Sequence, residues 1–397
     1  MSRYFSFLAL ASLLAACNTT PRSQQVTETA TVCSCELSPL ESIRRDSLCW
    51  ARAGITADFV PPESRSLTRT LADFTQLQHE IDTLAAEGGG TLLIPQGSYA
   101  LKEVIRIPSN VAVVGASAAN TIIHIKLKEV FENSRHWMRP LGQAAAFLFD
   151  GSRNAALERL TLRYAAADFE PLDFEEYHHD WVRGVYHAEE QRDTALWVTT
   201  VWFNGAENCR LSQCRILQAG NHPVRIRDSR HITSSQNFID RAYNKSGGGA
   251  GYYNLIGSEY CLLYQDTVKR IRHLSIHKGS RYNVVYGCEL QVDVNFHNAD
   301  RGHNLVENNR VRIPSWHSWH CFGTGAASKH EPPGPGNVLY RNATDYKGRG
   351  PEADSTVLYF MTDHYPKKEL GEKNLVPTKL ASEFPYGIYQ PVNRLLP

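Results

Sequence analysis

Five twelve-residue lines between residues 205 and 311 align with one another without gaps. They read GAENCRLSQCRI (205–216), DSRHITSSQNFI (228–239), GSEYCLLYQDTV (257–268), GSRYNVVYGCEL (279–290) and DRGHNLVENNRV (300–311). The twelfth position is always aliphatic, and the fifth and tenth are Cys, Ile, Asn or Asp. Lines that recur every 20 to 30 residues are typical of solenoids, in which each coil stacks on its neighbour at a strand spacing of roughly 4.8 Å. Stacked aliphatic residues then fill a linear core, and stacked asparagines can form ladders. The lines therefore predict a parallel β-helix.

A second signature lies upstream, in residues 69–117. Phe74, Leu77, Ile81 and Leu84 recur at helical spacing, Asp73 can cap the start, and a Gly-Gly-Gly run at 88–90 ends the helix. Short aliphatic strands separated by Pro, Gly and Asn turns follow. We expect a helix over residues 70–87 that covers the first coil of the solenoid.

Three motifs carry a resemblance to a known family: GGGT (88–91), LIPQGSY (93–99) and IPSNVAVVG (107–115). This stretch resembles the opening of the pectate-lyase-like β-helix superfamily, and the resemblance covers about residues 70–345. It implies an all-β fold, a single-stranded right-handed parallel β-helix with an N-terminal capping helix and long loop insertions. The superfamily includes polysaccharide lyases, polygalacturonase-type hydrolases, epimerases and phage tailspikes, so the resemblance implies a glycan-active protein without selecting one chemistry.

The N-terminal residues have the layout of a secretion signal. Arg3 precedes an apolar run (5–14) that is too short to span a bilayer, and small residues then precede Cys17. This arrangement resembles a bacterial lipobox, although an ordinary signal peptide with a chance cysteine is the alternative. We expect a lipoprotein signal peptide at 1–17 and a lipid on Cys17 that anchors the exported chain at the outer membrane or cell surface. Residues 18–60 are predicted to be a tether, 61–345 the β-helix domain and 346–397 a C-terminal capping segment.

The net charge limits the class of partner, and the cysteine spacing limits which disulfides can form. A net charge of +1 without a basic field argues against nucleic acid as a partner, and membrane contact is expected only through the lipid anchor. Among the nine cysteines, Cys209 and Cys261 share a column two coils apart, roughly 9.6 Å, beyond disulfide reach. Cys214 and Cys288 are farther apart, and all four are predicted to be small buried side chains. Pairing stays open for the three cysteines near the N-terminus, Cys33, Cys35 and Cys49.

Three insertions interrupt the coils: an acidic one at 168–193, a glycine-containing one at 237–257 and a Trp- and His-rich one at 314–336. Insertions of this kind commonly wall the binding side of a solenoid. Trp181, Trp316 and Trp319 are candidate platforms for stacking sugars, with simple loop packing as the alternative.

The strand before each line predicts which side chains point away from the core, because orientation alternates along a strand. The predicted outward patch contains Arg225, Arg227, His277 and His297, with Asp293 at its edge. The other candidate site residues on or beside this face are Trp202, Lys245, Lys278 and Arg301.

A cationic patch with aromatic neighbours suits an acidic, uronate- or sulfate-bearing polysaccharide. It also suits β-elimination, which needs a base for the proton next to a uronate carboxylate and a cation for the charge that develops. His277 or Lys245 is the predicted base, Arg227 the neutralising group, and His297 or a tyrosine the acid. A polysaccharide lyase is therefore the favoured function.

Two other classes stay open. A β-helix glycoside hydrolase needs two carboxyl groups about 5 to 9.5 Å apart, and on the predicted face only Asp293 qualifies. Its candidate partners are Asp240, Glu259, Glu175, Glu176 and Asp180. The third class is a non-catalytic glycan-binding surface protein, for which the patch is only a polar face. No cofactor is assigned: calcium is compatible with lyase chemistry but has no identifiable ligands, and the pairs His178–His179 and His317–His320 are weak metal signals.

Overall fold

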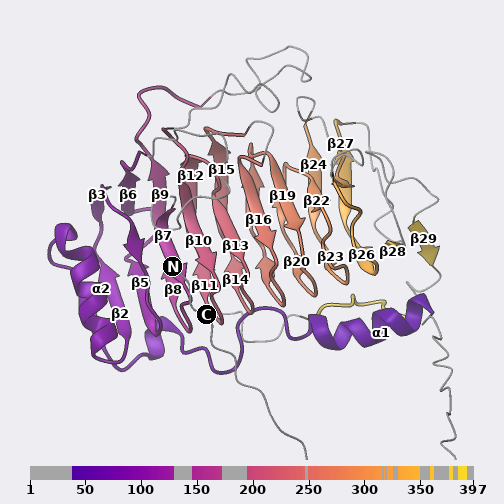
Figure 1. Ribbon diagram of the computed structural model, residues 1–397, viewed down its shortest axis with the longest axis horizontal. Helices are drawn as coiled ribbons and strands as arrows, with labels where there is room; N and C mark the ends of the chain where they lie inside the picture. Colours follow the sequence, from indigo (N-terminus) through magenta and orange to yellow (C-terminus); the bar gives the residue numbers. More distant parts are fainter. Residues whose placement is uncertain are drawn as a thin grey trace, which may run out of the picture. The chain divides into compact units, whose positions relative to one another are not determined.

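The computed structural model describes residues 38–128, 145–171, 195–245, 249–314, 317, 320–324, 330–348, 358–361, 375–378 and 383–390. Their strands form three sheets that stack coil upon coil, as the parallel ladders in Figure 1 show. The predicted all-β parallel β-helix is therefore confirmed. No helix among the described residues is long and apolar enough to cross a membrane.

The three sheets run the length of the solenoid. In order, sheet A contains β1 (Thr68–Thr70), β2 (Gly90–Ile94), β5 (Val111–Gly115), β8 (Ala156–Glu158), β11 (Arg210–Ser212), β14 (Thr233–Ser235), β17 (Leu262–Tyr264), β20 (Val284–Tyr286), β23 (Leu305–Glu307), β26 (Asn337–Tyr340), β28 (Leu358–Met361) and β29 (Leu375–Thr378). Sheet B contains β3 (Gly97–Leu101), β6 (Thr121–Ile125), β9 (Thr161–Tyr164), β12 (Arg215–Ala219), β15 (Phe238–Ala242), β18 (Thr267–Lys269), β21 (Glu289–Leu290), β24 (Arg310–Ile313) and β27 (Ala343–Tyr346). Sheet C contains β4 (Ile105–Arg106), β7 (Ala145–Asp150), β10 (Thr199–Asn204), β13 (Val224–Arg227), β16 (Tyr252–Ile256), β19 (His273–His277), β22 (Val294–His297) and β25 (Phe322–Thr324).

The repeated lines supply five strands of sheet A, the start of the sheet B strands that follow them, and the sharp turns on either side of each sheet A strand. Each line turns through one residue with left-handed backbone on either side of its sheet A strand, at its fourth and ninth positions (φ between 53° and 68°). Side-chain ladders at these turns satisfy backbone N–H groups: Asn304 Oδ1 accepts from Asn283 N at 3.0 Å, and Asn337 Oδ1 accepts from Asn304 N at 3.0 Å. The predicted cysteine columns are confirmed as buried, unpaired thiols at positions 209, 214, 261 and 288.

A helix caps the first coil as expected, but it begins later than the predicted residue 70, because Thr68–Thr70 form strand β1. A 3₁₀ turn (Phe74–Gln76) leads into helix α2 (Leu77–Ala86), and Asp73 accepts a hydrogen bond from Thr75 N at 2.9 Å. Leu77, Ile81 and Leu84 are buried against the end of the solenoid core.

The N-terminal boundary of the domain differs from the prediction. Residues 38–66, here called the strap, belong to the same compact unit as the coils. The strap holds helix α1 (Pro39–Trp50) and a 3₁₀ turn (Pro62–Ser64) and runs along the outer face of sheet A (Figure 1). Trp50 Nε1 donates to His303 O at 2.7 Å, and Ile55 N donates to Thr233 Oγ1 at 2.8 Å. The physical reason is that this face is apolar where α1 lies, with Leu262, Val284 and Leu305 buried beneath it. The described part of the predicted tether, 38–60, is therefore part of the domain.

The segment predicted as the glycine-containing excursion (237–257) is mostly regular structure, because it contains β15 and β16. Strand β16 pairs with β13 on one side and β19 on the other, so it is the sheet C strand of the coil whose line begins at Gly257, a strand that the sequence analysis did not recognise. Beyond the last parallel coil, β28 and β29 extend sheet A with antiparallel pairing. Several predicted features lie outside the described residues: Cys17, Cys33, Cys35, Trp181, Trp316 and Trp319.

Candidate functional site

The outer face of sheet C carries the predicted site residues. Register pairing confirms the alternation: Phe203, Ile226, Leu255, Ile276 and Phe296 lie in one column that is fully buried in the core. Two outward columns flank it. The first, called here the polar row, is Trp202, Arg225, Asn254, Ser275 and Asn295, and the second is Asn204, Arg227, Ile256, His277 and His297.

Strand β16 changes the spacing that the sequence implied. His277 and His297 are direct neighbours across two paired strands. Arg227 is separated from His277 by Ile256, so the two are two strands apart, roughly 9.6 Å at the strand spacing. The expected patch on consecutive coils is therefore split, because the alignment missed one strand.

The polar row contains a series of buried polar atoms without hydrogen-bond partners among the described residues. These are Trp202 Nε1, Arg225 Nε, Asn254 Oδ1 and Ser275 Oγ, on four adjacent strands, together with His277 Nδ1 in the next column. A buried polar atom without a partner costs about 1–3 kcal/mol. Folded proteins rarely leave four buried polar atoms in line unpaired, so each of these atoms requires a partner that the described residues do not supply.

Asp293 is the centre of a buried hydrogen-bond network at the edge of this face. Its side chain is fully buried, and its carboxylate accepts from His273 Nδ1 at 2.7 Å. Asn295 Nδ2 donates to Asp293 Oδ2 at 3.1 Å, and His317 Nε2 lies 3.5 Å from Asp293 Oδ1. Burial raises the pKa of Asp293 to about 6, while the nearby His317 opposes this rise. At neutral pH the carboxylate is therefore ionised and can only accept hydrogen bonds.

The network fixes the tautomer of His297. Because Asp293 only accepts, Asn295 must turn its NH₂ group toward it, which leaves Asn295 Oδ1 facing His297 Nδ1 at 3.1 Å. An amide oxygen also only accepts, so His297 Nδ1 carries the proton and donates it. The lone pair of the imidazole is therefore on Nε2.

The two imidazoles of the second column are held neutral. The His277 and His297 rings stack with centroids 4.8 Å apart, and His330 packs against His297 at 4.3 Å. Burial lowers the pKa of His277 to about 4, with further lowering by Lys278 and His330. Burial, followed by the neighbouring His277, lowers the pKa of His297 far below its usual range. Neutral imidazoles can act as bases.

Cationic side chains lie beside the imidazoles. The Arg225 guanidinium stacks over the Trp202 ring at 4.4 Å, and burial lowers the pKa of Arg225 to about 10, so it remains charged at neutral pH. Arg227 is more exposed and bonds Asp228 at 3.1 Å. Lys278 is exposed directly after β19. Lys245 is buried, and its Nζ donates to Ala242 O at 2.9 Å.

Other predicted residues lie away from this face. Arg301 Nη1 is 3.8 Å from Glu259 Oε1, beside a ladder of charged residues at the turn between sheets C and A. Asp240 lies on β15 of sheet B, where it pairs with Arg270. Neither Asp240 nor Glu259 therefore supplies the second carboxylate that a hydrolase would need beside Asp293. Glu175, Glu176 and Asp180 lie outside the described residues.

The described strands of sheet C present one more outward carboxylate, Asp150 on β7. It aligns with Asn204 at the far end of the second column and accepts from its amide at 2.7 Å. Five strand steps separate β7 from β22, so Asp150 and Asp293 are roughly 24 Å apart at 4.8 Å per step.

Sequence reasoning missed His273, Asn254 and the link from Asn295 to His297. The alternation of Asp293, Asn295 and His297 in one strand was visible, but the contact of Asp293 with His273 and His317 depends on chain segments far apart in sequence. Within the described ranges, no group of three His, Cys, Asp or Glu side chains is arranged to hold a metal ion.

Comparison with known proteins gives distant similarities of fold. No family model matches the chain, and no curated protein matches it by sequence. Carrot pectin methylesterase aligns over 80% of this chain and 89% of its own, with 9% identity and a TM-score of 0.46. An Aspergillus niger pectin methylesterase aligns over 83% and 98%, with 12% identity and a TM-score of 0.43. An iota-carrageenase in complex with iota-carrageenan fragments aligns over 68% and 59%, with 15% identity and a TM-score of 0.39. Similarities this distant assign no activity, so any function for this chain must be argued from its own residues.

Proposed function

We propose that this chain is a carbohydrate-active enzyme that cleaves an acidic polysaccharide by β-elimination on the outer face of sheet C. The observation that carries the proposal is the polar row, in which four buried polar atoms on adjacent strands have no partner among the described residues. Sugar hydroxyl and carboxylate groups offer both donors and acceptors for such atoms. Names of the distant structural neighbours, which include pectin methylesterases and a carrageenase, are compatible with a glycan ligand but do not carry the argument.

The cations beside the row favour an acidic glycan. The Arg225 guanidinium is held against Trp202, and its Nε has no partner among the described residues. A uronate carboxylate would supply an oxygen acceptor for this group, and a guanidinium binds carboxylates in a defined geometry. Lys278 and Arg227 add positive charge along the same face.

His297 is the proposed base, in place of His277 or Lys245. Its Nε2 lone pair is set by Asn295, whereas Lys245 is buried with its ammonium bonded to a carbonyl. In the proposed step, Nε2 removes the proton from the carbon next to the uronate carboxylate. The electron pair of that C–H bond forms the new double bond as the glycosidic C–O bond breaks. The departing oxygen then takes the proton from the His297 imidazolium.

Substrate binding would adjust the base. The pKa of free His297 is low because the ring is buried among other rings and cations that oppose its protonation. A bound carboxylate adds a negative charge to this surrounding and raises the pKa toward neutrality. Lys278 N donates to His297 O at 3.2 Å, so Lys278 is the cation beside the base that would stabilise the charge developing on the carboxylate as the proton leaves. Arg225 lies three strands from His297, roughly 14 Å at the strand spacing, and would bind the carboxylate of a neighbouring sugar unit.

The test is incubation of the purified chain with alginate, pectin, glycosaminoglycan and sulfated algal polysaccharides. We expect a rise in ultraviolet absorbance from an unsaturated uronate on at least one substrate, and its loss in His297→Ala. New reducing ends without that absorbance would contradict elimination and favour a hydrolase. Binding without either product would favour a non-catalytic glycan-binding protein.

We also propose that the chain is exported and anchored through a lipid on Cys17. The support is the apolar run at 5–14 with small residues directly before Cys17. Expression in a bacterium with a radiolabelled fatty acid tests this directly, because Cys17→Ser should abolish label incorporation. Label that persists in the variant would contradict the anchor.

A further inference from the structure

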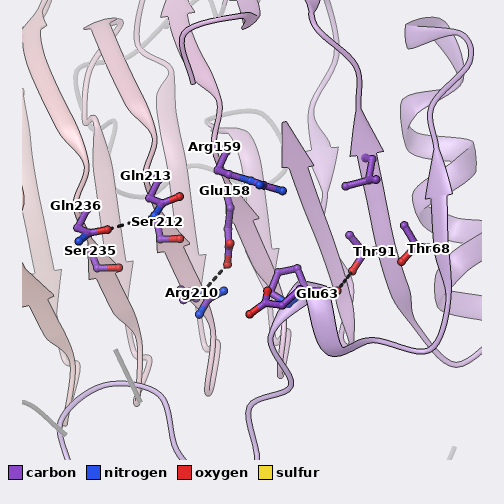
Figure 2. Close-up of a pocket in the computed structure, with 12 residues that line it drawn as sticks. Glu63, Thr68, Thr91, Glu158, Arg159, Arg210, Ser212, Gln213, Ser235 and Gln236 are labelled. Atoms are coloured by element: carbon purple, nitrogen blue, oxygen red, sulfur yellow. Dashed lines mark hydrogen bonds and ion pairs between the residues drawn. The ribbon is translucent and has the colours of Figure 1, made fainter. Parts of the chain in front are cut away.

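A polar hollow lies on the outer face of sheet A, beside residues 62 and 63 of the strap. It encloses about 480 Å³, within the range of about 300–1,000 Å³ that is typical of small-molecule sites. Figure 2 shows its lining: side chains from β1, β2, β8, β11 and β14, the turn residues that follow β8, β11 and β14, and Glu63 of the strap.

One outward column of sheet A explains why the hollow is polar. Glu158, Ser212 and Ser235 align on adjacent strands, and the same column continues as Tyr264 and Tyr286. The tyrosines are covered: Tyr264 packs in the cluster that includes Trp50 of the strap, and Tyr286 contacts Tyr389. The column is thus aromatic where chain segments cover it and polar where the hollow leaves it open.

The polar groups of the hollow have unused hydrogen-bonding capacity. The hydroxyls of Ser212 and Ser235 have no partner among the described residues, although both side chains line the hollow. Glu158 accepts from Arg210 Nε through Oε1, and no described residue donates to its Oε2. The carboxyl is largely buried, and burial raises its pKa. Because this group is held in place by Arg210, it presents a fixed acceptor to whatever enters.

The amide groups add donors and acceptors in a repeating pattern. Gln213 Nε2 donates to Gln236 Oε1 at 3.3 Å, and Gln236 Nε2 donates to Gln265 Oε1 at 3.3 Å. Figure 2 shows Gln213 and Gln236 beside the serines of the same coils. Serine hydroxyls and glutamine amides therefore repeat from coil to coil, at roughly 4.8 Å. A chain of linked units lying along the solenoid axis would meet the same groups at successive coils.

Charge decides the class of ligand. The lining holds two acidic residues, Glu63 and Glu158, and two basic ones, Arg159 and Arg210, so its formal charges cancel. The guanidinium of Arg210 is also committed to Glu158 and stacks over Phe59 at 4.9 Å. A balanced site rich in hydroxyl and amide groups suits a neutral polyhydroxylated ligand and offers an anion little.

We propose that this hollow binds a neutral saccharide segment, as a glycan-holding site separate from the face of sheet C. The proposal does not depend on β-elimination, because no residue of sheet C lines the hollow.

The experiment is isothermal titration calorimetry of the full chain with neutral cello- and xylo-oligosaccharides and with oligogalacturonate. The blocking variant is Ser235→Tyr, because tyrosine already occupies the next positions of the same column in the native fold. We expect neutral oligosaccharide binding that weakens at least 10-fold in this variant. In case the tyrosine disturbs the coil, the double variant Ser212→Ala/Ser235→Ala removes both hydroxyls and should weaken binding by about 2- to 10-fold for each one.

His297→Ala is the control, since it alters only sheet C and should leave neutral binding within about twofold of native. Neutral binding that is absent, or unchanged in both hollow variants, would overturn the proposal. Binding of oligogalacturonate that depends on Arg159 would also overturn it, by identifying an anion site. Elimination activity is measured separately, so failure of the hollow and failure of the proposed enzyme are distinguished.

Discussion

Replacing Asp293 by Asn should reverse the tautomer of His297 without touching that ring. In the native chain Asp293 accepts from both His273 and Asn295. In Asp293→Asn, the new amide keeps its oxygen toward His273 Nδ1 and turns its NH₂ toward Asn295. Asn295 must then rotate to present its oxygen, which places its NH₂ against His297 Nδ1. That nitrogen becomes an acceptor, and the proton moves to Nε2, where the base is needed.

The size of the effect follows from the hydrogen bonds. For His297 Nε2 to carry the lone pair in the variant, two buried N–H donors of this hydrogen-bond chain must face each other without an acceptor, which costs about 1–3 kcal/mol. If the reacting tautomer must be restored at this cost, kcat falls about 5- to 150-fold. Substrate affinity should change little, because the cations and the other four residues of the polar row are unchanged.

Two measurements check this reasoning. Steady-state absorbance of the unsaturated product gives kcat and KM, and ¹⁵N chemical shifts of His297 report which ring nitrogen carries the proton. The matched control is Asp266→Asn. Asp266 is also fully buried, and burial raises its pKa to about 6. Its carboxylate, however, bonds Ser234, Asn237 and Tyr253, away from the sheet C face. If Asp293→Asn had the native kcat, or if the proton of His297 were still on Nδ1, the assigned hydrogen-bond chain from Asp293 through Asn295 to His297 would be refuted.

Three further outcomes follow from the structure. Arg225→Ala should lower kcat/KM by at least about tenfold, and Arg225→Lys should recover only part of it, because an ammonium cannot reproduce the guanidinium fork stacked on Trp202; initial rates on the acidic substrate measure both. Burial raises the pKa of Glu307 to about 7, above about 4.3 for an unfolded glutamate. The native fold therefore retains a proton that the unfolded chain has lost, so the stability advantage over Glu307→Gln should shrink as pH rises from about 4 to 7, as urea midpoints at several pH values would show. Asn304→Ala leaves the Asn283 N–H without an acceptor and should lower the free energy of unfolding by about 1–3 kcal/mol, against less than about 0.5 kcal/mol for the exposed Arg310→Ala.

Most of the fold could be predicted from the sequence repeat. The aliphatic column and the Asn positions predict stacking, since like residues at fixed offsets have one simple arrangement, and the cysteine columns follow from the same register. Strand β16 was not predicted, because the line that follows it begins 29 residues after the previous line and the glycines before the strand suggested a loop. The strap was not predicted for a different reason. Nothing in residues 38–60 repeats, and its packing depends on an apolar column of sheet A that lies up to about 250 residues away in sequence.

The candidate site was predictable where it depends on alternation. Orientation of Arg225, His277 and His297 needs only the strand period. Roles within the site were not predictable, because the tautomer of His297 depends on a carboxylate whose other partners, His273 and His317, come from separate coils and insertions. The hollow on sheet A had no sequence signal, since its lining brings Pro62 and Glu63 of the strap against strands of distant coils.

The strap has a consequence for how the molecule unfolds. A solenoid whose coils touch only their neighbours can fray from either end, one coil at a time. Here a single segment near the N-terminus bonds coils at Thr233 and His303, which are 178 and 253 residues away from their partners. Loss of a terminal coil therefore requires release of contacts with the middle ones, which makes unfolding more cooperative. The same geometry means that the strap, although it is synthesised first, can dock only after the coils that contain Thr233 and His303 have formed.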